Sequence, residues 1–122
     1  SSMARWWNGE IEPSSPLSNI HPSLDVSDCI SLNKNNYDAF YKTDLSDILS
    51  RFEVEDIVIT GVMTHICCDT TARSAFQRGY NVSFVIDGTA TYNLDFHRAT
   101  LLTLAHCCAR PVLSSRILEA FK

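Results

Sequence analysis

The chain has 122 residues, of which 45% are hydrophobic and 20% charged, and its formal net charge is −4 at neutral pH. This length supports one domain around one core, and the composition is typical of a globular protein. Because the charge is negative and no basic stripe occurs, we expect no nucleic-acid partner. No apolar run reaches membrane-spanning length and no signal peptide is recognisable, so we expect no membrane partner.

The cysteine pattern bears on the cellular compartment. There are five cysteines, an odd number, and four of them form the adjacent pairs Cys67–Cys68 and Cys107–Cys108. Such an arrangement does not resemble a secreted disulfide framework. It predicts a reducing, cytoplasmic location. The first residue is Ser1 rather than methionine, which indicates a processed or truncated chain.

Residues 1–27 show no clear periodicity and contain three of the four prolines. We expect a long ordered loop here rather than a flexible linker, because Trp6 and Trp7 need burial or a ligand. Two interpretations of these tryptophans stay open. They cover the edge of the core, or they form one wall of a pocket.

Residues 29–33 are compatible with a short strand, which places Lys34 where that strand gives way to a loop. Ligands of parallel α/β sheets bind at this carboxyl edge. Taken alone, however, Lys34 is equally compatible with the alternative of a solvated lysine that has no catalytic role. Thr43 or Asp44 is suited to cap a helix over residues 45–52.

The next segment carries the strongest chemical signal. Residues 56–60 are β-branched and apolar, which predicts a strand buried on both faces. After Gly61, helical spacing over residues 67–78 predicts a helix that begins at Cys67. Backbone N–H groups and the helix dipole at that position favour a thiolate, which is a nucleophile, and an oxyanion. The alternative, a buried structural cysteine, is equally compatible with this local pattern.

The remaining elements continue the alternation of strands and helices. Residues 81–86 predict a buried strand that ends at a turn over Asp87 and Gly88. Residues 95–108 predict an amphipathic helix, with Phe96, Ala99, Leu102, Thr103 and His106 at helical spacing. A short strand at residues 112–113 and a helix through Phe121 follow. The order predicts a three-layer αβα fold, a parallel Rossmann-like sheet with helices on both faces.

Two motifs together resemble a known family. The first consists of Lys34, Tyr37, Ala39, Phe40, Thr43 and Leu45, and the second is the segment from Gly61 to Arg73. With both in hand, the chain resembles the isochorismatase-like cysteine hydrolases, which include nicotinamidases and N-carbamoylsarcosine amidohydrolases. The resemblance extends from about Ala4 to the C-terminus. It implies one hydrolase domain over residues 1–122, with residues 1–27 as an active-site loop region.

The resemblance also implies a mechanism. In that family an aspartate, a lysine and a cysteine act together. By motif position Cys67 would be the nucleophile, and Lys34 would stabilise its thiolate. The family's cis peptide would fall at Val62–Met63 and would aim the N–H groups of Met63 and Cys67 into an oxyanion hole. The thiolate would attack an amide or similar carbon, and water would hydrolyse the resulting thioester.

The chain departs from the family pattern in one respect. The triad aspartate of the family ends its first strand, and no such strand precedes Trp6. We therefore expect the first strand and helix to be missing, and neither Asp25 nor Asp28 replaces the aspartate. The fragment alone would then be nearly inactive. A companion segment that supplies the strand, or a homo-oligomer, would cover the exposed edge.

We expect no metal and no cofactor. The metal-binding members of the family use an upstream aspartate-x-histidine motif that is absent here, and His21 and His65 do not replace it. Adjacent cysteines on a helix point about 100° apart, so each pair is a poor chelate.

The leading functional hypothesis is a cysteine hydrolase that acts on a small amide or a related C–N or ether substrate. The predicted substrate pocket comprises Trp6, Trp7, Tyr37, Phe40 and Thr64. Two alternatives remain, a non-catalytic assembly module derived from the same fold and a thiol redox protein that uses Cys67 and Cys68.

Overall fold

The computed structural model describes all residues, 1–122, and divides into two compact units, residues 1–31 and residues 32–122. The first unit contains the short helix α1 (Ser2–Trp7) and the 3₁₀ turn η1 (Pro16–Ser18), neither of which buries a residue. The sequence predicted a loop over all of residues 1–27, and this prediction is wrong for these two short helical segments. Trp6 is 79% exposed and Trp7 43% exposed.

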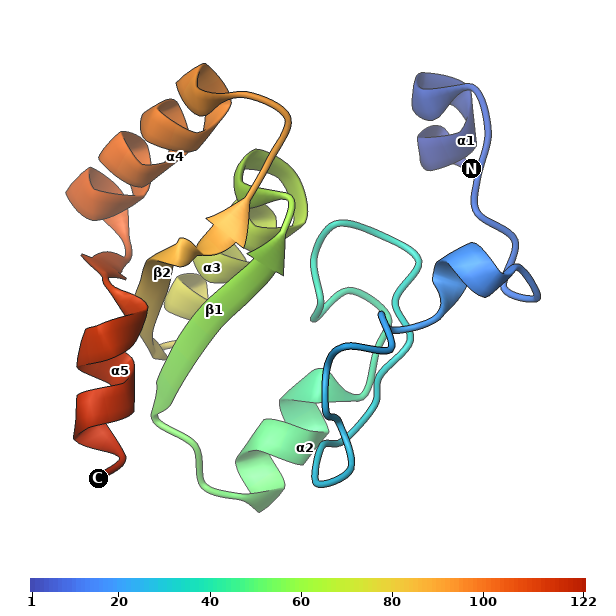
Figure 1. Cartoon of the computed structure of the whole chain (residues 1–122). Helices are drawn as coiled ribbons and strands as arrows, with labels where there is room; N and C mark the ends of the chain where they lie inside the picture. Colours follow the sequence, from blue (N-terminus) through green and yellow to red (C-terminus); the bar gives the residue numbers. More distant parts are fainter. The chain divides into compact units, whose positions relative to one another are not determined.

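The second unit alternates helices and strands along the chain (Figure 1). Its elements are α2 (Leu45–Arg51), β1 (Asp56–Val62), the π-helical turn η2 (Thr64–Cys68), α3 (Asp69–Gln77), β2 (Asn81–Ala90), α4 (Leu94–Cys107), β3 (Arg110–Val112) and α5 (Ser114–Ala120). Each predicted element from residue 45 onward is present, with ends that differ by a few residues. The predicted strand at residues 29–33 does not form, because this segment pairs with no other strand.

The three strands form one parallel sheet in the order β1-β2-β3. β1 is an edge strand that pairs only with β2, in a register that sets Ile59 opposite Phe84. The prediction that this strand is buried on both faces is wrong. Ile59 is buried, whereas Val58 and Val62 are 41% and 67% exposed. Nothing in the second unit pairs with the other edge of β1.

β2 is longer than predicted, because the segment expected to form a turn after it is an irregular part of the strand. The register shifts between Ile59 and Gly61 of β1, so that Gly61 lies opposite Thr89. The Thr89 hydroxyl donates to the Val85 carbonyl at 2.8 Å and closes the irregular segment. A Cβ on Gly88 would stand 2.8 Å from Val85 Cγ1, so this close approach requires glycine.

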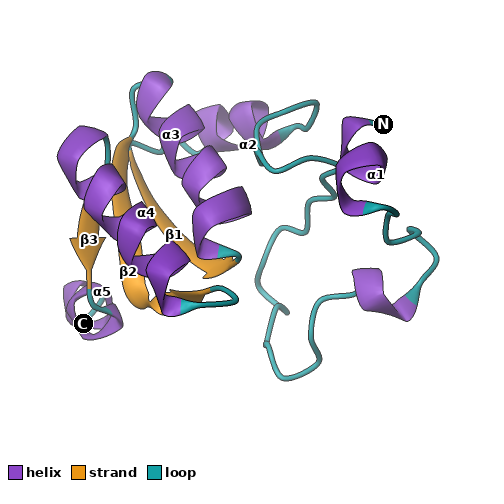
Figure 2. Cartoon of the chain, turned by 90° about the horizontal axis from the view of Figure 1, so that it is seen from above, coloured by secondary structure: helices purple, strands orange, loops and turns teal.

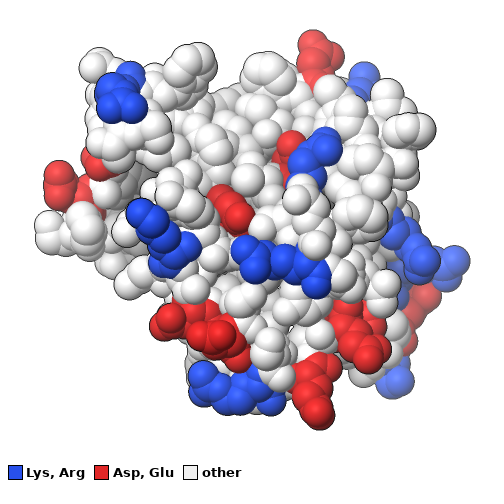
Figure 3. All heavy atoms as spheres, turned by 180° about the vertical axis from the view of Figure 1, so that it is seen from behind, with Lys and Arg blue, Asp and Glu red and all other residues white.

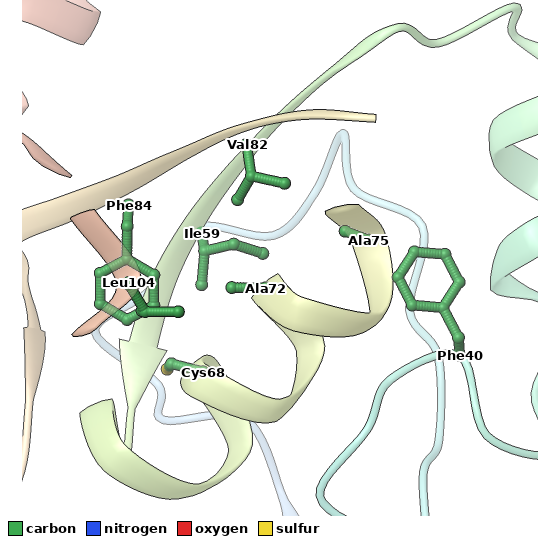
Figure 4. Packing of buried hydrophobic residues seen from close by; sticks show 8 residues of the cluster. All are labelled: Phe40, Ile59, Cys68, Ala72, Ala75, Val82, Phe84 and Leu104. Atoms are coloured by element: carbon green, nitrogen blue, oxygen red, sulfur yellow. The ribbon is translucent and has the colours of Figure 1, made fainter. Parts of the chain in front are cut away.

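The core lies between α3, α4 and one face of the sheet (Figure 4). Ala72 and Ala75 have no exposed surface, which lets α3 approach the sheet closely. Phe40 lies beside Ala75 at one end of α3, and Cys68 lies at the other. The cluster comprises Phe40, Ile59, Cys68, Ala72, Ala75, Val82, Phe84 and Leu104.

α4 packs through a different face from the predicted one. Thr100 and Leu104 are buried, whereas Phe96 and Leu102 are 45% and 74% exposed. Ala99, Thr103 and His106 are exposed as well. Apolar residues occur on both sides of this helix, so spacing alone does not select the side that meets the core.

Helices lie on both sides of the sheet, as predicted. Figures 1 and 2 show α3 and α5 on opposite sides of the strands. The alternation along β2 agrees with this, because Phe84 belongs to the α3-side cluster and Val85 is buried outside it. α5 contacts β2. The second unit is thus an α/β fold with a parallel sheet.

Acidic and basic side chains are interspersed on the face shown in Figure 3, without a continuous patch of one sign. None of the helices combines the length and the apolar character needed to span a bilayer.

Candidate active site

Cys67 lies on a single π-helical turn at the carboxyl end of β1. The turn η2 runs directly into α3, so the helix proper begins at Asp69 and not at Cys67 as predicted. The Met63 carbonyl accepts from the N–H groups of Ile66 and Cys68, at 3.1 and 3.2 Å, and so fixes the turn. The Val62–Met63 peptide bond at its entrance is cis. Cys67 itself is half-buried.

Lys34 reaches this cysteine from a position 33 residues earlier in the chain. Its Nζ lies 3.4 Å from Cys67 Sγ and donates to the Asn36 carbonyl at 2.7 Å. The ammonium group is therefore the hydrogen-bond donor that stands beside the sulfur. Neither of the two ion pairs in the structure involves Lys34, so its charge is directed at the sulfur and the carbonyl.

Thr71 of α3 holds the loop that carries Lys34, a role that the sequence did not reveal. The Thr71 hydroxyl accepts from the Ala39 N–H at 3.0 Å and donates to the Tyr37 carbonyl at 3.3 Å. Phe40 anchors the same loop in the core and stacks on Tyr80, with ring centroids 6.0 Å apart. Because η2 runs directly into α3 and Thr71 follows Cys67 by four residues, this continuous segment positions both the sulfur and the lysine loop.

Two histidines make contacts at the turn, His65 within it and His97 beside it on α4, and sequence reasoning missed what they do. His97 Nδ1 lies 2.8 Å from the hydroxyl of Thr64, the first residue of η2. Its Nε2 lies 3.1 Å from the Ile86 carbonyl. His65 pairs with Thr91 at 2.8 Å and stacks on Phe96, with centroids 4.4 Å apart. The His97 position falls at the start of the predicted helix, but no spacing rule links it to Thr64.

Cys68 belongs to the core. Its side chain is 4% exposed, and its sulfur lies 3.9 Å from the Thr60 carbonyl. Burial, followed by the charge of Cys67, raises the pKa of the Cys68 thiol to about 11, despite the opposing effect of Lys34. The two neighbouring cysteines are therefore chemically different, one beside an ammonium group and one held as a thiol.

The predicted pocket residues have unequal positions. Tyr37 is half-buried in the lysine loop. Phe40 is a core residue, and Thr64 is fully buried against His97, so their place in a pocket stays a prediction. Trp6 and Trp7 lie in the other unit, so their contribution to a pocket stays a prediction. No three histidine, cysteine or carboxylate side chains converge in a way that could hold a metal ion.

Comparison with known proteins gives a consistent result. The sequence model of the Isochorismatase domain matches residues 2–116. Nicotinamidase 3 from Arabidopsis thaliana is 39% identical over 108 residues, which cover 84% of this chain and 54% of the relative. A nicotinamidase structure from Staphylococcus aureus is 32% identical over 66% of this chain and 53% of that one, with a TM-score of 0.65.

A cysteine hydrolase structure from Pseudomonas syringae pv. phaseolicola covers 98% of this chain and 63% of that one, with a TM-score of 0.89 at 22% identity, and so shares the fold. The chain belongs to the isochorismatase domain family. It spans about half the length of the first curated relative that it matches.

Proposed function

We propose that this chain carries the nucleophile of a cysteine hydrolase that acts on small amides. The contact between Lys34 Nζ and Cys67 Sγ, 3.4 Å long, is the observation that carries the proposal. It joins two residues from distant parts of the sequence at the carboxyl edge of a parallel sheet, where ligands of α/β proteins bind. The similarity to two nicotinamidases supports a planar carboxamide as the substrate class.

The chemistry assigned to Cys67 is acyl transfer. The thiolate attacks the amide carbon, and the carbonyl electrons form an oxyanion. When that intermediate collapses, the C–N bond breaks, the amine leaves with a proton, and a thioester remains. Water then hydrolyses the thioester. We assign the oxyanion hole to the backbone N–H groups of Met63 and Cys67, which belong to the turn on which the sulfur stands.

We infer that the general base is a carboxylate supplied from outside these residues, on a strand that pairs with the free edge of β1. Two observations support this inference. β1 pairs on one side only and exposes Val58 and Val62. The relative from Arabidopsis is nearly twice as long as the matched segment, so proteins of this family have chain available for such a strand. A cytoplasmic location fits the five cysteines, all of which are free.

The test is the reactivity of Cys67 toward iodoacetamide at neutral pH, measured by mass spectrometry of the tryptic peptide 52–73 with fragmentation to separate Cys67 from Cys68. Lys34→Ala should slow the labelling of Cys67 by about threefold to tenfold, the effect of one partly exposed charge. Lys42→Ala is the matched control, because Lys42 lies over the Tyr41 ring and has no contact with the sulfur.

Labelling that spares Cys67 but modifies Cys29 or Cys107 would argue against the proposal. Equal rates in both lysine variants would do the same. With the general base restored, Cys67→Ala should abolish ammonia release from nicotinamide.

A non-catalytic assembly role remains the second candidate, and the open edge of β1 is the observation that favours it. It differs in two outcomes. Cys67→Ala would leave complex formation intact, and no amide would form a thioester on the chain.

A further inference from the structure

The second cysteine pair lies at the end of a helix, where the geometry differs from that expected within one. α4 ends at Cys107, and Cys108 leaves it with φ −159° and ψ −6°. The angular separation of neighbouring side chains on a helix therefore does not apply here. The two sulfurs approach to 3.1 Å, within hydrogen-bond distance. The expectation that this pair points apart is wrong.

A cation stands beside the outer sulfur. Arg73 of α3 places Nη1 3.4 Å from Cys107 Sγ, while its Nε donates to Asp69 at 3.0 Å. The carbonyls at the end of α4 disfavour a thiolate at this position. The positive charge of Arg73 offsets the effect of these carbonyl groups, since the guanidinium group is permanently protonated. Cys107 is exposed and lines a cavity of about 520 Å³ with Arg73, Leu102, Thr103 and His106.

The two thiols have different environments. Cys108 is half-buried, and burial together with its hydrogen bond to Cys107 raises the pKa of the Cys108 thiol to about 11. Cys107 is thus the sulfur that an external reagent meets, and Cys108 is a protonated neighbour within reach. An accessible thiol with a second thiol beside it is the arrangement of a reversible redox pair.

We propose that Cys107 and Cys108 form a dithiol site that hydroperoxides oxidise to an intrachain disulfide, separate from the Cys67 site. The Cys107 thiolate attacks the outer peroxide oxygen, the O–O bond breaks, and the alkoxide or hydroxide leaves and takes up a proton. Cys107 becomes a sulfenic acid. The Cys108 sulfur then attacks that sulfur, the S–O bond breaks, and water leaves. Two thiols are oxidised and one peroxide is reduced.

The reaction removes an obstacle to its own second step. The negative charge of Cys107 contributes to the raised pKa of Cys108, and a neutral sulfenic acid at Cys107 no longer carries that charge. A disulfide between chain neighbours deviates from relaxed geometry and is easily reduced. The product is therefore a reversible modification rather than a structural crosslink.

Trypsin separates the cysteines into three peptides, since Arg110 precedes Pro111. Cys29 falls in residues 6–34, Cys67 and Cys68 in 52–73, and Cys107 and Cys108 in 99–116. The protein is treated with increasing hydrogen peroxide, alkylated and digested. We expect the mass of peptide 99–116 to fall by that of two hydrogen atoms as the disulfide forms. Treatment with dithiothreitol should restore the mass of the reduced peptide.

Three variants sharpen the test. Cys108→Ser should leave a dimedone-reactive sulfenic acid at Cys107. Arg73→Gln should slow oxidation by about fivefold and Arg73→Lys by less, as expected for loss of one exposed charge contact. Arg78→Gln, at the residue that caps the C-terminal end of the same helix and lies over the Phe40 ring, is the control and should have no effect. Circular dichroism checks that each variant is folded.

Three results would overturn the proposal. The first is conversion of Cys107 to sulfinic acid with Cys108 still alkylated. The second is a Cys107 disulfide between two chains on a non-reducing gel, and the third is equal oxidation rates in the Arg73→Gln and control proteins. None of these bears on Cys67, so the proposed hydrolase stands or fails separately.

Discussion

At the scale of single residues, the hydrogen-bond directions around His97 are set by its partners. The Ile86 carbonyl can only accept, so Nε2 carries the ring proton. Nδ1 then accepts from the Thr64 hydroxyl, which has no solvent-exposed surface. Thr64 opens the turn that carries Cys67, so we expect His97 to position the proposed nucleophile without contact to its sulfur.

His97→Ala should lower stability by about 1–3 kcal/mol, because it leaves a buried hydroxyl without its partner. It should also slow iodoacetamide labelling of Cys67, since η2 loses a constraint. His97→Asn, which retains a short polar side chain, should recover part of the labelling rate. His106→Ala, on the exposed side of α4, is the control. Reduced stability in urea with an unchanged labelling rate would reduce His97 to a purely structural residue.

At the scale of elements, a carboxylate within β2 holds the start of α5. Asp87 accepts from the Ser114 N–H at 2.7 Å and from the Ser114 hydroxyl at 2.6 Å. It therefore caps a helix 27 residues away in the chain, and links the irregular part of β2 to the last helix. The hydrogen bond to the Ser114 side chain, then the one to its backbone, lowers the pKa of Asp87.

A carboxylate with a lowered pKa in the folded state stabilises the protein above its unfolded-state pKa, and the contribution disappears as the pH falls through the folded-state value. Asp87→Asn should therefore lower the melting temperature at pH 6, and the difference from the wild type should shrink below about pH 4. Thermal unfolding followed by circular dichroism measures this. Asp56→Asn is the control. A difference that stays constant between pH 6 and pH 3 would contradict the assignment.

At the scale of the whole molecule, the main feature is the unpaired edge of β1. A parallel sheet is normally covered on both faces, whereas here Val58 and Val62 are exposed on a strand with one partner. Unpaired N–H and C=O groups beside exposed valines favour pairing with another strand. We proposed above that a companion strand occupies this edge.

Without that strand, the 122-residue chain should self-associate through β1. Light scattering after gel filtration should give a mass above 13.7 kDa that increases with concentration. Val58→Lys should shift the population toward the monomer, because a lysine opposes edge pairing. Leu118→Lys on α5, which is also exposed, is the control. A monomer at every concentration would contradict self-association through the unpaired edge of β1.

The sequence by itself determined the order of elements from α2 to α5, the parallel sheet and the family. Strand and helix periodicities are local, and Gly79 marks the boundary between α3 and β2, so these features need no knowledge of distant contacts. The motif around Cys67 and the motif beginning at Lys34 were visible for the same reason. Residues 29–33 failed as a strand because a strand exists only through its pairing partner.

Only the tertiary structure decided which surfaces meet. It selected Thr100 and Leu104 as the buried face of α4. It also gave the distance between Lys34 and Cys67, a pairing that the resemblance had implied, and it brought Arg73 to the sulfur of Cys107. Each of these contacts joins residues far apart in the chain, and an amphipathic pattern with apolar residues on two sides is equally compatible with either packing. Spacing along the sequence determines on which side of a helix or strand each side chain lies. Contacts between elements depend on how all of them pack together in the core.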